Sequence, residues 1–211
     1  MLTSTTPSKL LIMIGPQGAG NHLFSKVFAG SPRIGGWKAL TGTYWKGHHT
    51  EPFAEVWASQ LKLAANMFLG YDYWVTSCSI PFICNGEPAI PDVNDIVKQA
   101  QALGISVELA VITRDTTVLE LQQTRVRGAA TIADFYETLQ SLDIPYHVFS
   151  HESLLLLKQD YVDYITQLVG FPQIKLDPTI IQDNANAKYI QHIDSHWLDA
   201  EVQKACNESK Q

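Results

Sequence analysis

Near its start the chain carries a strand–turn–helix pattern. Residues 10–14 form an unbroken apolar run, LLIMI, and the glycine-rich turn GPQGAG follows it directly. The stretch from Asn21 to Phe28 then has a composition that a helix accepts. A short apolar run bounded by Gly and Pro is typical of a buried strand. A buried strand followed at once by a helix predicts an α/β fold.

Strand and helix patterns continue to alternate along the chain. Residues 31–50 lack periodicity and are predicted to be a loop, and FICNGEPAIP, residues 82–91, is predicted to be another. Because such alternation produces a parallel sheet covered on both faces, we expect a three-layer P-loop fold with a central, mostly parallel sheet of about four or five strands flanked by helices. Further strands are predicted at 73–80, 105–113 and 145–149, and further helices at 51–69, 93–103, 115–127, 131–142, 150–169 and around 195–206.

Three helix starts carry residues that cap helices well. Thr50 precedes the helix predicted at 51–69, Asp92 precedes the next one, and Ser150 precedes the long helix at 150–169. A side-chain oxygen at this position accepts a hydrogen bond from an amide of the first turn. These residues therefore predict where the three helices begin.

The length bounds the number of domains. The 211 residues suffice for one substantial core. Neither a repeat nor a linker divides them, so we expect one α/β domain over residues 1–211, with 1–8 disordered.

The composition bounds the class of function and the location. A formal charge of −6, from 15 basic and 21 acidic groups, does not favour nucleic acid or a membrane as partner. The sequence has no apolar run of bilayer-spanning length and no signal-peptide pattern at its start. Its three cysteines show no CxxC spacing. A cytoplasmic location is expected.

The glycine-rich turn has half of a Walker motif. Gly15 and Gly20 stand where the pattern GxxxxGK[ST] has its glycines, but Asn21 and His22 replace the lysine and the hydroxyl residue. Those two residues serve the outer phosphates and magnesium in phosphoryl transfer. The turn therefore predicts phosphate binding by backbone amides, helped by Asn21 and His22 as donors, without a metal. The alternative is a tight turn that binds no ligand.

The loops that follow the strands are where a ligand should lie, because open parallel sheets bind ligands beyond the C-terminal ends of their strands. The predicted strands end at Ile14, Ile80, Thr113 and Phe149. Arg114 directly follows the third of them, and its guanidinium can offer a planar fork to a phosphate. A surface salt bridge is the alternative role for Arg114.

Three segments resemble, in the expected order, segments of the P-loop sulfotransferase superfamily. GPQGAGNHLF resembles the 5′-phosphosulfate-binding loop, G-x-P-[KR]-S-G-T-T-x-L. VITRDTT resembles the strand that ends in Arg-Asp-Pro, and YHVFSHESLLLLKQDYVDYITQLVGFP resembles V-x-Y-E-D-L followed by a helix ending in F-L-G. The resemblance implies a transferase that moves a sulfuryl group from 3′-phosphoadenosine 5′-phosphosulfate (PAPS) to a hydroxyl or amine of a small-molecule or carbohydrate acceptor, with no metal required.

The resemblance also implies roles for particular residues. Arg114 would bind the 3′-phosphate of the donor, and Gln122 aligns with a serine eight residues after that arginine. The loop residues that would bind the donor are Gly15, Gln17, Gly18, Ala19, Gly20, Asn21, His22 and Leu23.

The chain departs from the family pattern at two places. The loop's basic residue aligns with Gly18, and Ser77-Cys78-Ser79 lacks the lysine and the histidine base of many members. A base would have to come from elsewhere, and the candidate catalytic residues are His22, His48 and Glu51.

Two other functions stay open. GPQGAG also resembles the GPPGAGK start of adenylate-kinase-type enzymes, which indicates a degenerate P-loop nucleotide or metabolite kinase. The third possibility is a non-catalytic member of the fold that binds a phosphorylated ligand or a partner protein. The sequence leaves the acceptor and the oligomeric state open.

Overall fold

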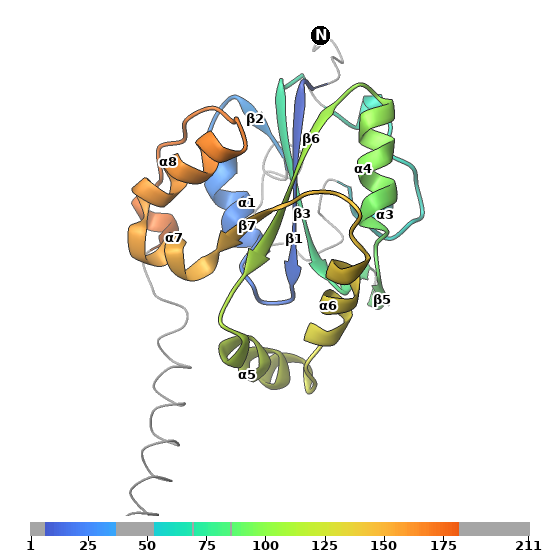
Figure 1. The fold of residues 1–211 in the computed structure, drawn as a ribbon, viewed down its shortest axis with the longest axis vertical. Coiled ribbons are helices and arrows are strands. Elements are labelled where there is room, and N and C mark those ends of the chain that lie inside the picture. The colour runs from blue at the N-terminus through green and yellow to red at the C-terminus, as the bar shows by residue number, and fades with distance from the viewer. Residues whose placement is uncertain (1–6, 37–52, 69, 85, 182–211) are drawn as a thin grey trace, which may run out of the picture.

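A five-stranded parallel sheet forms the centre of the computed structural model, which describes residues 7–36, 53–68, 70–84 and 86–181 (Figure 1). The strands lie in the order β2-β3-β1-β6-β7, and every neighbouring pair is parallel. This confirms the predicted α/β fold with helices on both faces of a parallel sheet. The strands are β1 (Lys9–Pro16), β2 (Ile34–Gly35), β3 (Tyr73–Ile80), β6 (Ser106–Thr113) and β7 (His147–Ser150).

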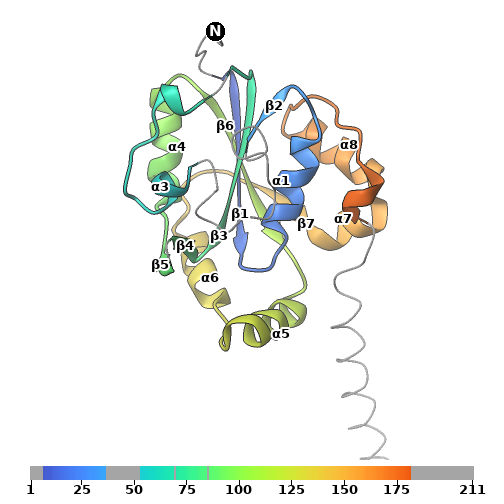
Figure 2. The same ribbon diagram turned by 180° about the vertical axis from the view of Figure 1, so that it is seen from behind.

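Helices cover both faces of the sheet (Figures 1 and 2). One face carries α1 (Asn21–Ala29), α7 (His151–Leu157) and α8 (Gln159–Leu168), and the other carries α3 (Ala54–Trp57), α4 (Val93–Ala102) and α6 (Ile132–Ser141). Helix α5 (Thr116–Arg127) lies beyond the C-terminal ends of the strands. The remaining elements are a hairpin of β4 (Phe82–Cys84) and β5 (Glu87–Ala89) and two 3₁₀ turns, η2 (Ala65–Met67) and η3 (Pro178–Ile181).

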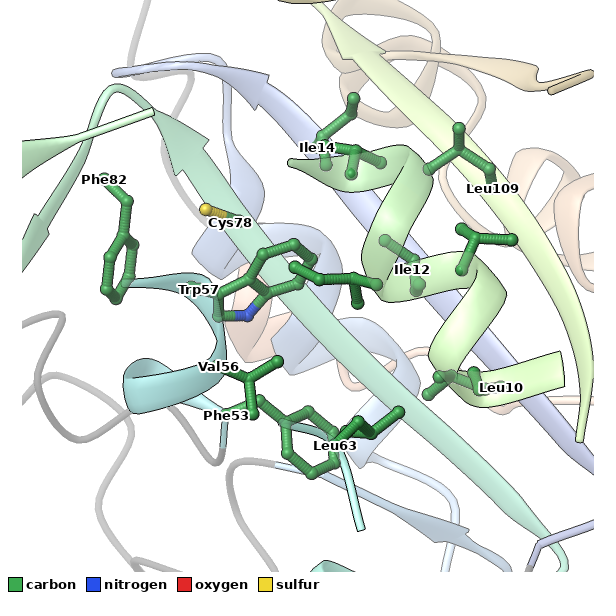
Figure 3. Close-up of a cluster of buried hydrophobic side chains, with 14 of the residues drawn as sticks. Leu10, Ile12, Ile14, Phe53, Val56, Trp57, Leu63, Cys78, Phe82 and Leu109 are labelled. Atoms are coloured by element: carbon green, nitrogen blue, oxygen red, sulfur yellow. The ribbon is translucent and has the colours of Figure 1, made fainter. Parts of the chain in front are cut away.

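The central strand is apolar on both sides because both layers need a core. Leu10, Ile12 and Ile14 of β1 pack with Trp57 and neighbours on the α3–α4–α6 face (Figure 3). Alternate β1 residues face the α1–α7–α8 layer instead. Since side chains alternate across a strand, a continuous apolar run is what a strand buried between two layers requires.

Capping residues set several helix starts as expected. The Asp92 carboxylate accepts from the amide of Asp95, and the Ser150 hydroxyl accepts from the amide of Ser153. Asp115 does the same at the start of α5, accepting from Val118. Thr50 lies outside the described residues.

The helix predicted at 51–69 is wrong over residues 53–68. Only α3 and η2 form there, because Ser59, two residues after the end of α3, takes a left-handed φ of 58° and turns the chain. Although this segment is irregular, it places the side chains of Phe53, Val56 and Trp57 in the core (Figure 3). Their helical spacing therefore reflects contact with the core and not a long helix.

Three smaller predictions also need correction. The long helix at 150–169 divides into α7 and α8 at Lys158, whose φ is 50°. The loop predicted at 82–91 contains the β4–β5 hairpin, and the loop at 31–50 contains the short strand β2. Of the segment 1–8, residues 1–6 lie outside the described residues, and the Ser8 hydroxyl donates to the carbonyl of Asp72 over 2.8 Å. The predicted helix around 195–206 lies outside the described residues.

A charged cluster ties the starts of three structural elements together. On β6, Glu108 lies 3.1 Å from the Nζ of Lys9 and 3.0 Å from the Nε2 of His147. Lys9 also donates to the carbonyl of Val169 over 2.7 Å. Burial raises the pKa of the Glu108 carboxyl, but hydrogen bonds from His147 and Lys9 and the charges of both outweigh it. The net pKa is lowered.

A Glu108→Gln variant should lose stability near neutral pH and not in acid. A carboxyl whose pKa is lowered by folding stabilises the protein above its unfolded pKa, and this stabilisation is lost as the pH falls through the folded pKa. We expect the variant's unfolding free energy to be about 1 kcal/mol below wild type at pH 7, from urea denaturation, with the gap closing below about pH 4. Asp143→Asn is the control: its carboxylate pairs with Lys98 at 3.5 Å, both side chains are over half exposed, and little change is expected. An equal loss at both pH values would contradict the role of charge.

Candidate functional site

The candidate site lies where the sheet connections diverge. From β1 the chain leads through α1 to β2, which is one edge strand of the sheet. From β6 it leads through α5 and α6 to β7, which is the opposite edge strand. In open parallel sheets, ligands bind at such a switch point, beyond the C-terminal ends of the two strands. The glycine loop, residues 15–20, begins with the last two residues of β1, and Arg114 follows β6. Two regions that the sequence singled out therefore meet at one edge of the sheet.

The glycine loop has the backbone of an anion-binding turn. Gly18 and Gly20 have φ values of +90° and +112°, which glycine adopts without the strain that a side chain imposes. The amide of Ala19 donates to the Pro16 carbonyl over 3.0 Å. Within the described ranges, the amides of Gly18, Gly20 and Asn21 have no protein acceptor. Amides of this kind at the N-terminal end of a helix, α1, favour an anion.

The inner side of the loop is filled by glutamine side chains. Gln17 is 1% exposed, and its Nε2 donates to the Pro81 carbonyl over 2.8 Å. The Gln17 carbonyl accepts from the Nε2 of Gln123 over 2.7 Å, and Gln123 in turn accepts from the Thr131 amide over 2.8 Å. The side chain of Gln17 therefore holds the loop on the hairpin that follows β3, and the fully buried methyl of Ala19 packs in the core. These residues shape the loop from within.

Asn21 does not point its side chain at a ligand, contrary to the sequence-based expectation. Its Nδ2 donates to the Ser79 hydroxyl over 2.9 Å and to the Gly15 carbonyl over 3.3 Å, and the residue is 3% exposed. One turn later, the Ser25 hydroxyl donates to the Ser77 hydroxyl over 2.7 Å. Residues spaced by four on a helix and by two on a strand line up, so this side of α1 is bonded to β3. Only the amide of Asn21 remains available to an anion.

Gly15 is explained by packing. A Cβ there would lie 2.9 Å from the Oδ1 of Asn21 and 2.9 Å from the carbonyl of Ile112. The strand end and the start of α1 approach too closely for any side chain. The first glycine of the motif therefore serves the fold and not a ligand directly.

Arg114 is held against the loop. Its Nη1 donates to the Gly18 carbonyl over 2.6 Å, across 96 residues of sequence, and to the Oε1 of Gln122. The residue is 8% exposed. The structure thus brings together Gly18, Arg114 and Gln122, which were singled out separately from the sequence. A positive charge lies directly beside the unpaired loop amides.

His151 is the site residue that the sequence analysis missed. It follows β7 directly, and its Nδ1 lies 3.0 Å from the Ala19 carbonyl. A Cβ on Gly20 would lie 2.6 Å from that same nitrogen, so the ring packs on the loop backbone. Burial and the charge of Arg114 lower the pKa of His151 more than Glu152 and the Ala19 carbonyl raise it. The signal was its position, since it is the first residue of α7, at the C-terminal end of β7.

The other predicted residues are placed as follows. His22 is the second residue of α1 and is half-buried, and Leu23 packs partly against the core cluster under α1. His48 and Glu51 lie outside the described residues. Within the part of the chain that the structure describes, no group of His, Cys, Asp or Glu could hold a metal ion.

Two further observations bear on ligands and membranes. A cavity of about 410 Å³ lies between the start of α4 and α6, and no residue of the glycine loop lines it. In the same described ranges, no helix has the length and the apolar character needed to cross a membrane.

Comparison with known proteins adds no relative. The sequence matches no protein-family model, and neither a curated protein nor a solved structure matches the chain.

Proposed function

We propose that the chain is a sulfotransferase-like enzyme, which binds PAPS at the glycine loop and transfers its sulfuryl group to a hydroxyl or amine. One observation carries the proposal. At the switch point of the sheet, Arg114 is bonded to the same loop whose amides have no protein acceptor within the described residues. The resemblance of three sequence segments supports the same assignment.

The residues present fit an anionic donor. The amides of Gly18, Gly20 and Asn21 have no protein acceptor in the described structure, and they lie at the positive end of α1. Gly18 and Gly20 add no side chain in front of these amides. Arg114 would offset the charge of a phosphate that approached the loop. These groups would hold the 5′-phosphate and the 3′-phosphate of an adenosine donor.

The geometry favours sulfuryl transfer over magnesium-dependent phosphoryl transfer. A kinase loop needs a lysine on the outer phosphates and a hydroxyl that ligates Mg²⁺. Asn21 stands in the lysine position, and its side chain is bonded to Ser79 and Gly15. The amide side chain of Asn21 is neutral, so no change of its rotamer would supply the positive charge of the lysine.

The loop amides have a clear chemical task in such a reaction. When bound, PAPS supplies the sulfuryl group and leaves as adenosine 3′,5′-bisphosphate. Donors fixed where negative charge develops lower the barrier, since they need no rearrangement during the reaction. Of the candidate bases, His22 is the second residue of α1 and follows these amides directly in the chain, so we propose it as the group that exchanges a proton at this edge. His48 and Glu51 stay candidates for the acceptor side.

Calorimetry tests the binding part of the proposal. Adenosine 3′,5′-bisphosphate should bind with heat at micromolar to low millimolar concentration, without magnesium. Adenosine 5′-monophosphate, which lacks the 3′-phosphate, should bind more weakly. No heat with millimolar bisphosphate would overturn the proposal.

Product assays then separate the three functions. Transfer of a labelled sulfuryl group from PAPS to a panel of hydroxyl and amine acceptors would support the enzyme. Turnover of ATP with magnesium would instead favour the kinase. Binding of the bisphosphate with no transfer to any acceptor would favour the non-catalytic binding protein.

A further inference from the structure

His151 has one ring nitrogen bonded to the loop and one without a partner. A carbonyl only accepts hydrogen bonds, so Nδ1, 3.0 Å from the Ala19 carbonyl, carries the hydrogen. In the neutral ring Nε2 is then an acceptor. The residue is 4% exposed, and none of the described residues donates to Nε2. A buried acceptor left unpaired is costly, and so is a buried N–H without an acceptor, so protonation of this nitrogen would be stabilising only with a negative charge or an acceptor close to it.

The groups around the ring favour its neutral form on balance. The loop contributes the Ala19 carbonyl, the end of β6 contributes Arg114, and α7 contributes Glu152. Burial and the positive charge of Arg114 disfavour the imidazolium, whereas Glu152 and the carbonyl favour it. The net effect lowers the pKa of His151.

We propose that His151 takes up a proton on Nε2 when an anion enters the glycine loop, so that the site binds anions more tightly as the pH falls. The proposal rests on the proposed function in one respect, namely that it places the anion in the same loop. The proton comes from solvent, and no other bond is made or broken.

The physical reason is that an anion changes the balance at the ring. Its negative charge would offset that of Arg114 and favour the imidazolium, whose Nε2–H is a donor where the neutral ring has an unpaired acceptor. Between the pKa of the empty site and that of the loaded site, binding takes up one proton. In this window the Kd of the anion should rise by up to about tenfold for each pH unit of increase.

Inorganic sulfate is the probe, because its own charge is constant from about pH 5.5 to 8.5. We expect the Kd of sulfate for the wild-type chain, measured by calorimetry, to rise with pH across this range. In His151→Gln the Kd should be independent of pH. His147→Gln is the matched control, since His147 pairs with Glu108 at the start of β7, and it should keep the wild-type dependence.

A second variant and a measurement on the wild type decide the assignment. His22 is the other histidine of this loop, so loss of the pH dependence in His22→Gln, with its retention in His151→Gln, would overturn the proposal. In the wild type, NMR titration of the His151 ring should show a higher pKa with saturating sulfate than without it. An unchanged titration would also overturn it.

The two proposals fail in different ways. If the bisphosphate and sulfate bind but the Kd of sulfate does not change with pH, the role of His151 is wrong and the proposed function stands. If neither anion binds at any pH tested, both are overturned.

Discussion

Replacing Gly20 with alanine is expected to lower the free energy of unfolding by about 2–5 kcal/mol. The backbone there has a φ of +112°, which strains any residue with a side chain. In addition, the new Cβ would lie 2.6 Å from the Nδ1 of His151. That ring is buried and bonded to the Ala19 carbonyl, so it cannot move aside without loss of the contact. Chemical denaturation would measure the loss.

Gly128 provides the matched control. Its φ of +80° also lies in the left-handed region, but a Cβ there meets nothing within 4 Å. Gly128→Ala should therefore show the conformational cost alone, about 1 kcal/mol. The difference between the two variants is the cost of the contact with His151.

A double variant tests whether His151 is the obstacle. Alanine at position 151 removes the ring that the new methyl would meet, so the added cost of Gly20→Ala should be smaller in a His151→Ala background than in wild type. Equal costs in both backgrounds, or equal losses in Gly20→Ala and Gly128→Ala, would contradict the close packing of this loop.

Arg114→Ala is expected to weaken the binding of adenosine 3′,5′-bisphosphate by about 30- to 500-fold, which corresponds to about 2–4 kcal/mol. The variant removes the positive charge next to the loop and also the donor to the Gly18 carbonyl, so both the charge and the shape of the site change. Calorimetry at one salt concentration measures the affinity, and a thermal unfolding curve records any loss of stability.

Two further variants separate charge from shape. Arg114→Lys keeps the charge without the planar fork, and an intermediate loss is expected. Arg33→Ala removes another arginine, whose guanidinium lies 5.7 Å from the ring centre of Tyr73 at the start of β3, far along that strand from its C-terminal end. It should leave the affinity unchanged. An Arg114→Ala protein that binds as tightly as wild type would leave the fold unaffected and remove the proposed site.

Elements governed by local or repeating patterns were predictable from the sequence. The strand at 73–80 has the predicted ends, and the helices that begin after Asp92 and Ser150 start where their caps indicate. The start of each of these helices depends on a hydrogen bond between residues at most four positions apart. The strand depends on an apolar pattern that continues along its length. The prediction of a helix at 51–69 was wrong because the apolar residues of this segment are spaced to reach the core from an irregular path and not from one face of a helix.

The candidate site was predictable only in part. The glycine loop and Arg114 could be singled out because the sequence shows which residues follow each strand. The orientation of their side chains could not. Asn21 looked like a phosphate ligand, but its side chain donates to the hydroxyl of Ser79 on β3, 58 positions further along the chain. His151 begins the helix that follows the fourth predicted strand, and nothing in the sequence marked it as a site residue.

The order of apolar, glycine and capping residues by itself determined that this chain alternates strands and helices and carries an amide-rich turn after its first strand. Only the tertiary structure decided that Arg114 and His151 meet on that turn and that Gln17 and Asn21 face inward. The reason is physical: a backbone turn depends on neighbours in the sequence, whereas the partner of a buried polar side chain is whichever donor or acceptor the packed sheet brings within about 3 Å.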